Sequence, residues 1–259
     1  MKIYIHTDLE GISGIDAAEQ VPRDSEHYRA SCEKLMLDVN AAVAGAFEGG
    51  ADHVTVLDSH GGGGNFIVEM LDERAENDTK PNGKWWGIMD ESYDGTFFIG
   101  AHAMAGTING FLDHTQSSVQ WFSYSINGRP CGELAQWAVV ASAFGVPMLM
   151  VSGDEAACAE ARAFFSPVET AAVKRATGRN RAIALPEEQA RERIRQAARR
   201  AVRLVGKAKP FSPLKPMEIL VTYNRADYCE AVLDRKGIER IDARTVRKVT
   251  SDPLDILPR

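Results

Sequence analysis

IYIHTDLEG, residues 3–11, is the stretch of this sequence that decides its fold. Its apolar half predicts a buried β-strand that runs into a loop at Gly11. Successive side chains of a strand alternate between its two faces, so His6, Asp8 and Glu10 share one face. Two carboxylates this close repel each other, and a cation, a proton or a metal ion has to compensate them. A structural alternative stays open at this point, with Asp8 capping the next helix and Glu10 in solvent.

The segment that follows completes a strand–helix–strand unit. Apolar residues recur at helical spacing within residues 25–48, and two glycines at 49–50 end that helix. A second strand is predicted over residues 53–57. In such a unit the strands are parallel neighbours, and their C-terminal ends lie at the edge where open α/β sheets bind ligands. Four side chains are therefore expected to converge there, namely Asp8, Glu10, Asp58 and His60.

Four consecutive glycines at residues 61–64 raise the question of a phosphate-binding loop. The pattern Gly-x-x-x-x-Gly-Lys-Ser/Thr is absent, and no Gly-x-Gly-x-x-Gly follows the first strand. We therefore expect the glycine run to let the backbone pass close to a crowded site. A helix is predicted after it, over residues 66–75.

Two more motifs place candidate residues beside predicted elements. A buried strand over residues 96–100 is followed by His102, and His114 comes twelve residues after that. Residues 119–126 alternate like a strand, and the Asn-Gly pair at 127–128 is a strong hairpin signal. Glu133 then begins a helix that runs to residue 144. The helix dipole favours a carboxylate in the first turn, so a structural role for Glu133 stays open here.

The rest of the chain predicts further strands and helices and a small C-terminal unit. Strands are expected over residues 147–151, 168–174, 217–223, 238–242 and 245–250, and helices over residues 154–165, 186–205 and 226–233. Residues 175–181 are expected to form a loop, and residues 207–216, with three prolines, a linker. The fold class is therefore α/β, with a mixed, largely parallel sheet flanked by helices. We expect a metal-binding catalytic domain over residues 1–206 and a small α+β module over residues 207–259.

Composition excludes several classes of protein. The 259 residues carry a net charge of −6, which argues against a general nucleic-acid binder, and the arginines of residues 186–205 suit a solvated face or an oligomer contact. No apolar run is long enough to cross a membrane, and the first residues show no basic region followed by an apolar one, so no signal peptide is expected in this stretch. The four cysteines are scattered, which favours free thiols in the cytoplasm over disulfides or a structural zinc site.

Three of the six histidines stand out, because His60, His102 and His114 follow buried strands or lie in loops beside small residues. A lone histidine of this kind is more often a core group than a ligand. Together with Asp8, Glu10 and Glu133, the three form a donor set that suits zinc, and also manganese, cobalt or iron. If Asp8 bridges, Glu10 and His60 can hold one ion, and His102 and Glu133 a second. Two-metal sites of this composition catalyse hydrolysis.

The motifs also resemble a known family, the D-aminopeptidases of the bacterial dipeptide-transport type, or DppA-like zinc metallopeptidases. Motif order and spacing are kept over most of the chain, and no single motif is generic. The motifs are Asp8-Leu9-Glu10-Gly11-Ile12-Ser13-Gly14, Asp58-Ser59-His60, Gly100-Ala101-His102-Ala103, His114, Asn127-Gly128-Arg129-Pro130-Cys131-Gly132-Glu133, Pro147-Met148-Leu149-Met150-Val151-Ser152-Gly153-Asp154 and Thr170-Ala171-Ala172-Val173-Lys174.

The resemblance implies two zinc ions per chain, a catalytic role for His114 and a ring-shaped homodecamer whose active sites face an internal chamber. The implied zinc ligands are Asp8 as the bridge, Glu10, His60, His102 and Glu133. The sequence departs from the family's pattern beside the site, at the glycine run and at Met104, and it ends earlier. These departures concern the family's preference for D-amino acids and the assembly more than the metal chemistry.

The leading hypothesis is therefore a cytoplasmic, dinuclear zinc aminopeptidase that acts on short peptides or amino-acid amides, with D-residues first as the family's preference. His114 is placed to move protons or to stabilise an oxyanion. A two-metal phosphoesterase would use the same ligands, but no arginines converge in the motifs to hold a phosphate. A non-catalytic metal-binding assembly protein is the third hypothesis, and the retained His114 weighs against it.

Overall fold

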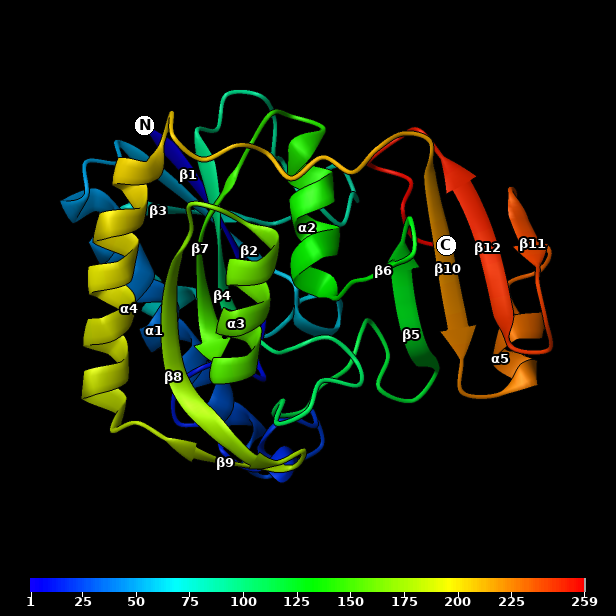
Figure 1. Cartoon of the computed structure of the whole chain (residues 1–259). Coiled ribbons are helices and arrows are strands. Elements are labelled where there is room, and N and C mark those ends of the chain that lie inside the picture. Colours follow the sequence, from blue (N-terminus) through cyan, green and yellow to red (C-terminus); the bar gives the residue numbers. More distant parts are fainter. Residues whose placement is uncertain (259) are drawn as a thin grey trace.

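The computed structural model describes residues 1–258 and contains two β-sheets (Figure 1). The larger sheet has seven strands in the order β3-β2-β1-β4-β7-β8-β9, parallel except for β9, which runs antiparallel to β8. Its strands are β1 (Lys2–Thr7), β2 (His53–Asp58), β3 (Ala75–Asp78), β4 (Gly95–Ala101), β7 (Met148–Asp154), β8 (Glu169–Gly178) and β9 (Arg181–Ala184). This confirms the predicted mixed, largely parallel sheet.

Helices cover both faces of the large sheet. On one face α1 (Tyr28–Glu48) packs against α4 (Glu187–Ala201), and their apolar stripes share a core with β1, β2 and β4. On the other face lie α2 (Glu133–Ser142) and α3 (Glu155–Phe164), which form a second core with the same sheet (Figure 1). Because both faces are covered, the central strands are almost continuously apolar.

The smaller sheet is antiparallel, in the order β11-β12-β10-β5-β6, and lies at the far side of α2 (Figure 1). Helix α2 is buried over residues 134–141 because it packs on the large sheet with one side and on this sheet with the other. The Asn127-Gly128 pair joins β5 to β6 with both residues at positive φ, as the hairpin signal predicted. The elements are β5 (Trp121–Ile126), β6 (Arg129–Pro130), β10 (Met217–Tyr223), α5 (Ala226–Glu230), β11 (Ile238–Arg240) and β12 (Thr245–Thr250).

Strands β5 and β6 come from within the first 206 residues, so the two predicted parts of the chain share this sheet. The division at residue 206 stays a prediction. Four short 3-10 turns complete the described elements: η1 (Ala18–Gln20), η2 (His60–Gly62), η3 (Val68–Met70) and η4 (Val202–Leu204). None of the helices within residues 1–258 has the length and apolarity that a membrane crossing requires.

Two predicted elements are wrong. Residues 66–75 form no α-helix but only the turn η3, because the Asn40 side chain binds the backbone at Met70 and Asp72 and directs the chain into β3. Residues 175–181 are not a loop, since β8 continues to Gly178 and pairs with β9 in a hairpin. Buried and exposed residues alternate over residues 174–177, as expected for a strand with one face on the core.

The C-terminal ends of β1, β2 and β4 meet at one edge of the large sheet, because Thr7 pairs with Asp58 on one side and with Ile99 on the other. Beyond this edge the loop after β1 packs backbone against backbone on the end of β4. The Gly11 amide donates to the Gly100 carbonyl at 2.8 Å, and a side chain on Gly11 would meet a carbonyl oxygen at 2.0 Å. The glycines therefore allow the close approach that brings the two loops together.

Candidate metal centre and active site

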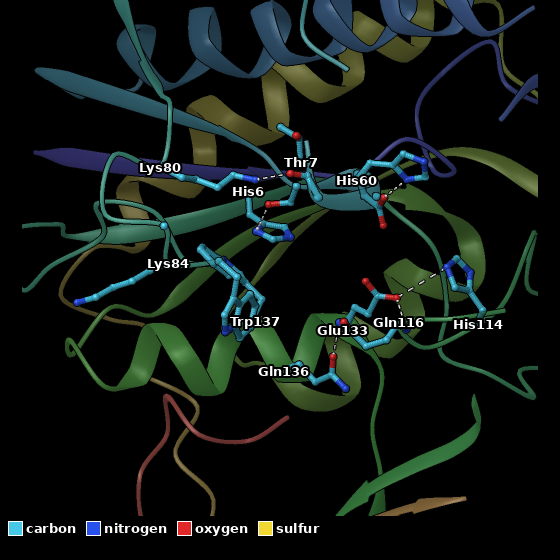
Figure 2. Close-up of a pocket in the computed structure, with 16 residues that line it drawn as sticks. His6, Thr7, His60, Lys80, Lys84, His114, Gln116, Glu133, Gln136 and Trp137 are labelled. Carbon is cyan, nitrogen blue, oxygen red and sulfur yellow. Dashed lines mark hydrogen bonds and ion pairs between the residues drawn. The ribbon is translucent and has the colours of Figure 1, made fainter. Parts of the chain in front are cut away.

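All six predicted site residues converge at this sheet edge. Asp8 and Glu10 follow β1, His60 lies in η2 after β2, and His102 follows β4. His114 comes from the next loop and Glu133 is the first residue of α2, facing the strand ends across the cavity (Figure 2). Segments far apart in the sequence thus contribute three carboxylates and three imidazoles to one place.

Asp8, Glu10 and His60 form the first group, whose ligand atoms all lie within 4.8 Å of one another. The His60 Nδ1 atom is 2.9 Å from Asp8 Oδ1 and 3.0 Å from Glu10 Oε2, but only the contact with Asp8 has hydrogen-bond geometry. The Glu10 Oε2 atom is buried and has no hydrogen-bond partner. A buried carboxylate oxygen without a partner is costly unless it binds a cation.

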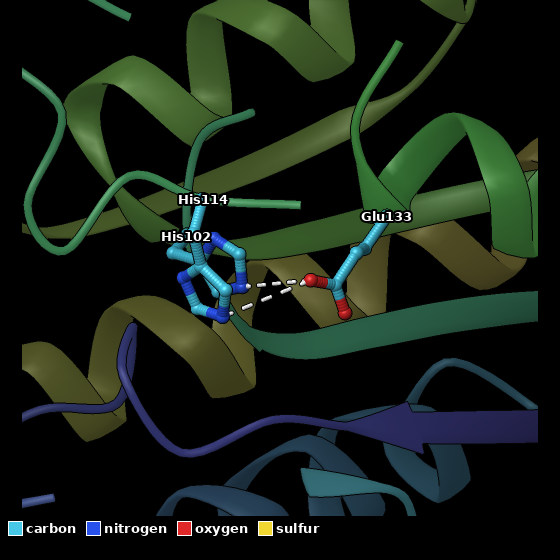
Figure 3. Close-up of side chains that lie close together, drawn as sticks. All are labelled: His102, His114 and Glu133. Carbon is cyan, nitrogen blue, oxygen red and sulfur yellow. Dashed lines mark ion pairs between the residues drawn. The ribbon is translucent and has the colours of Figure 1, made fainter. Parts of the chain in front are cut away.

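His102, His114 and Glu133 form the second group (Figure 3). Glu133 Oε1 is 3.4 Å from His102 Nε2 and 3.9 Å from His114 Nε2, and the two rings stack with centroids 3.9 Å apart. The His102 Nε2 atom is buried without a hydrogen-bond partner, and Asp8 Oδ2 lies 3.3 Å from it. Asp8 therefore presents one oxygen to each group.

The backbone fixes which nitrogen of two histidines faces the cluster. His102 Nδ1 is 3.0 Å from the carbonyl oxygen of Ala103, and His114 Nδ1 is 2.7 Å from that of Leu112. A carbonyl oxygen only accepts, so each Nδ1 carries the proton and donates it. In the neutral ring each Nε2 then presents its lone pair toward the cluster, where a cation can bind. Metal-binding histidines are commonly oriented in this way by a backbone carbonyl.

The buried carboxylates of the cluster carry negative charge that a nearby cation would stabilise. Burial opposes ionisation of Glu133, but the neighbouring His102 and His114 lower its pKa to about 2. Burial would lower the pKa of His60, yet the carboxylates of Glu10 and Asp8 raise it to about 11. The same balance raises the pKa of the buried His102 well above its ordinary value. Protons on the histidines or divalent ions between the ligands can neutralise these carboxylates.

The donor set fits divalent ions better than protons. Each group contains a buried atom without a hydrogen-bond partner, Glu10 Oε2 in the first and His102 Nε2 in the second, and mixed imidazole and carboxylate ligands are typical of zinc. Each group offers three protein ligands, the number that catalytic zinc sites use while keeping a position open for water or substrate. The geometry is therefore compatible with two ions, with Asp8 placed between them.

The cluster opens into a cavity of about 500 Å³ (Figure 2). Trp137 and Gln136 line it from α2, one turn after Glu133, and Lys80 lines it from the loop after β3. None of these three residues was predicted from the sequence. Helical spacing from Glu133 was a usable signal for Gln136 and Trp137, because residues three and four apart share a helix face. No pattern in the sequence indicated Lys80.

Asp58 and His6 lie near the site but belong to neither group of candidate ligands. Asp58 was predicted to converge with the ligands, but its carboxylate accepts hydrogen bonds from the backbone amides of Asn65 and Phe66 and from the Asn65 side chain. The Asp58 carboxylate therefore stabilises the glycine loop of residues 61–64 rather than joining the ligand cluster. His6 lies in the cavity wall against Phe98 and Trp137, and burial lowers its pKa to about 3.

Buried side chains support the ligand-bearing loops from behind. The Lys174 ammonium donates to the carbonyl oxygens of Glu10 and Ile15, which ties the loop after β1 to strand β8. Burial lowers the pKa of Lys174 to about 7. On the opposite side, Glu160 of α3 accepts a hydrogen bond from the Met104 amide at 2.8 Å, next to the segment that carries His102.

Three comparisons place the chain among known proteins. A family model described as D-aminopeptidase (Peptidase M55) matches residues 1–258. A D-aminopeptidase of Bacillus subtilis (strain 168) is 34% identical over 234 residues, which are 89% of this chain and 84% of that protein. The solved structure of the Zn-dependent D-aminopeptidase DppA from Bacillus subtilis, a self-compartmentalizing protease, matches with a TM-score of 0.92 at 30% identity. That match covers 99% of this chain and 94% of the other.

Proposed function

Because this chain belongs to the D-aminopeptidase family, we propose that it is a zinc-dependent aminopeptidase that releases the N-terminal residue of short peptides or amino-acid amides. The family resemblance predicted from the motifs is thereby confirmed. The observation that carries the proposal is the pair of three-ligand groups, which share a sheet edge and open into one cavity. We infer from the family that the first residue of the substrate is a D-amino acid.

We propose that Asp8 bridges two zinc ions, with Glu10 and His60 on one ion and His102 and Glu133 on the other. The 2.9 Å and 3.3 Å contacts from the two oxygens of Asp8 to His60 and His102 support this assignment. When bound, the ions would polarise the scissile carbonyl and lower the pKa of the attacking water. The protein's contribution is a rigid frame, because each ligand is held by a strand end, a helix start or a backbone hydrogen bond.

His114 is proposed as the catalytic residue rather than as a sixth ligand. Its Nε2 atom lies 3.9 Å from Glu133 and 4.0 Å from Glu10, longer than the His60 and His102 contacts, and its side chain is 16% exposed. With Nδ1 donating to Leu112, Nε2 can accept a proton from the attacking water and return it to the leaving amine. Stacking on His102 fixes the plane of the ring.

We further propose a closed homo-oligomeric ring, a decamer by analogy with the family. The structural relative is described as self-compartmentalizing. Exposed apolar side chains in the loop after β4 and in β5 offer contact surfaces, with Ile108 85% and Phe122 61% exposed. The arginine-rich face of α4 is a weaker candidate, since Arg195 and Arg200 bind Glu48 and Glu169 of the same chain.

A cytoplasmic location is proposed because all four cysteines are free and buried, as expected in a reducing compartment. Neither alternative function gains support, since the family and both relatives are D-aminopeptidases. The direct test is the rate at which zinc-loaded protein hydrolyses paired D- and L-alanine amides and dipeptides, beside p-nitrophenyl phosphate. We expect hydrolysis of D-alanine amide. Hydrolysis of the phosphate ester alone would refute the proposed function.

A further inference from the structure

The active-site cavity has two ends of opposite character. Asp8 and Glu133 are its only carboxylates among the described residues, and both belong to the ligand cluster. The other end is lined by Lys80 and Lys84, with glycine backbone around them. A ligand that fills this cavity therefore meets metal ligands at one end and ammonium groups at the other.

Lys80 is the better placed of the two ammonium groups. Figure 2 shows its side chain extending toward Thr7, across the cavity from Glu133, whereas Lys84 points away from the cluster. The Lys80 Nζ atom donates to the carbonyl oxygen of Gly62 at 2.9 Å. The ammonium has three protons, so this bond leaves capacity for a further acceptor.

No carboxylate within residues 1–258 forms an ion pair with Lys80. The lysine also has a left-handed backbone, with φ at 52°, which is uncommon outside glycine and is held by a hydrogen bond from its amide to Asp78. The turn thus directs into the cavity an ammonium group whose one hydrogen-bond partner among residues 1–258 is a neutral carbonyl. Such a group binds an anionic ligand more strongly than a neutral one.

We propose that Lys80 binds the C-terminal carboxylate of the substrate, so that the enzyme prefers short peptides with a free C-terminus. This inference rests on the proposed aminopeptidase function and adds its substrate class. If the N-terminal residue of a di- or tripeptide binds at the ligand cluster, the remaining one or two residues extend through the cavity toward Lys80. A free carboxylate at that end pairs with the ammonium, and a C-terminal amide or a longer chain does not.

The first test compares two substrates of the zinc-loaded wild-type protein, D-Ala-D-Ala and its C-terminal amide. The expected kcat/KM ratio is about ten- to a hundredfold in favour of the free carboxylate, the range that a charged hydrogen bond supplies. Most of the difference should lie in KM, because the ammonium contacts the ground state and the transition state alike. Equal kcat/KM values for the two substrates overturn the inference and leave the proposed function standing. If neither substrate is hydrolysed, the proposed function fails and this inference with it.

The second test uses Lys80→Gln, which keeps a donor for the Gly62 carbonyl but removes the charge. The ratio between D-Ala-D-Ala and its amide should fall toward one, while the matched exposed variant Lys236→Gln keeps the wild-type ratio. If Lys80 only holds the glycine loop, Lys80→Gln retains the ratio, and the inference is wrong. Calorimetric binding of a non-hydrolysable analogue with a reduced peptide bond gives the same comparison without turnover, and its free-carboxylate form should bind at least about tenfold more tightly.

Discussion

Glu160→Gln tests whether a buried carboxylate behind the proposed metal ligands titrates as its surroundings predict. Glu160 lies between the segment after His102 and the glycine before Glu133: its Oε2 accepts from the Met104 amide, and its Oε1 is buried without a partner beside Gly132. Burial raises the pKa of Glu160 from 4.5 to about 7. Glutamine keeps the acceptor for Met104 and removes the charge.

The magnitude follows from the linkage between protonation and folding. The folded chain holds the Glu160 proton up to about pH 7, whereas the unfolded chain releases it near pH 4.5. The stability that this proton contributes is therefore present at low pH and lost as the pH rises through 7. With these two pKa values the contribution to the free energy of unfolding is about 2.5 kcal/mol at pH 5 and close to zero at pH 8.

The assay is the melting temperature of wild type and Glu160→Gln at pH 5 and pH 8, both freed of metal, which is the state to which these pKa values refer. For a chain of this size about 1 kcal/mol corresponds to about 2 to 4 °C. The difference between variant and wild type should therefore shift by about 5 to 10 °C in favour of the variant from pH 5 to pH 8. Other titrating groups cancel in this difference. An unchanged difference between the two pH values would refute the reasoning.

Three further predictions concern catalysis, the frame and assembly. His114→Ala should keep its metal content and lose about a hundred- to ten-thousandfold in kcat with a smaller change in KM, whereas His60→Ala should lose metal; loss of metal from both would make His114 a ligand. Gly100→Ala should lower the melting temperature and the metal content, because its Cβ would lie 2.1 Å from the Asp8 carbonyl oxygen, while Gly178→Ala, with open space around it, should change neither. Light scattering should give a mass several times the 28.3 kDa of one chain, and a fully active monomer would contradict the ring.

Residues near the site were predictable wherever a strand end determined their position. Asp8 and Glu10 lie just beyond the end of β1, so the strand end rather than the expected alternation along an extended backbone brings them to the site, and parallel strands brought His60 and His102 to the same edge. The same rule failed for Asp58, whose carboxylate accepts hydrogen bonds from backbone amides of its own loop. The sequence does not show whether a carboxylate at a strand end binds its own loop or joins the site.

Other features depend on contacts that no local pattern records. The cavity position of Lys80 follows from an uncommon backbone conformation held by Asp78. The burial of Lys174 beneath the Glu10 carbonyl depends on strand order across the sheet. The β8–β9 hairpin was not predicted because its basic residues suggested a loop. β9 is the edge strand of the sheet, and charged side chains on an edge strand prevent pairing with other chains.

A zinc titration of the metal-free protein tests the two-ion centre most directly. Chelator-treated protein receives increasing zinc, and hydrolysis of D-alanine amide is measured beside the bound zinc determined by elemental analysis. The proposed assignment, with Asp8 between Glu10 and His60 on one side and His102 and Glu133 on the other, predicts that activity rises to a plateau at about two ions per chain. Full activity with one ion bound, or with none, would contradict a dinuclear centre built from these residues.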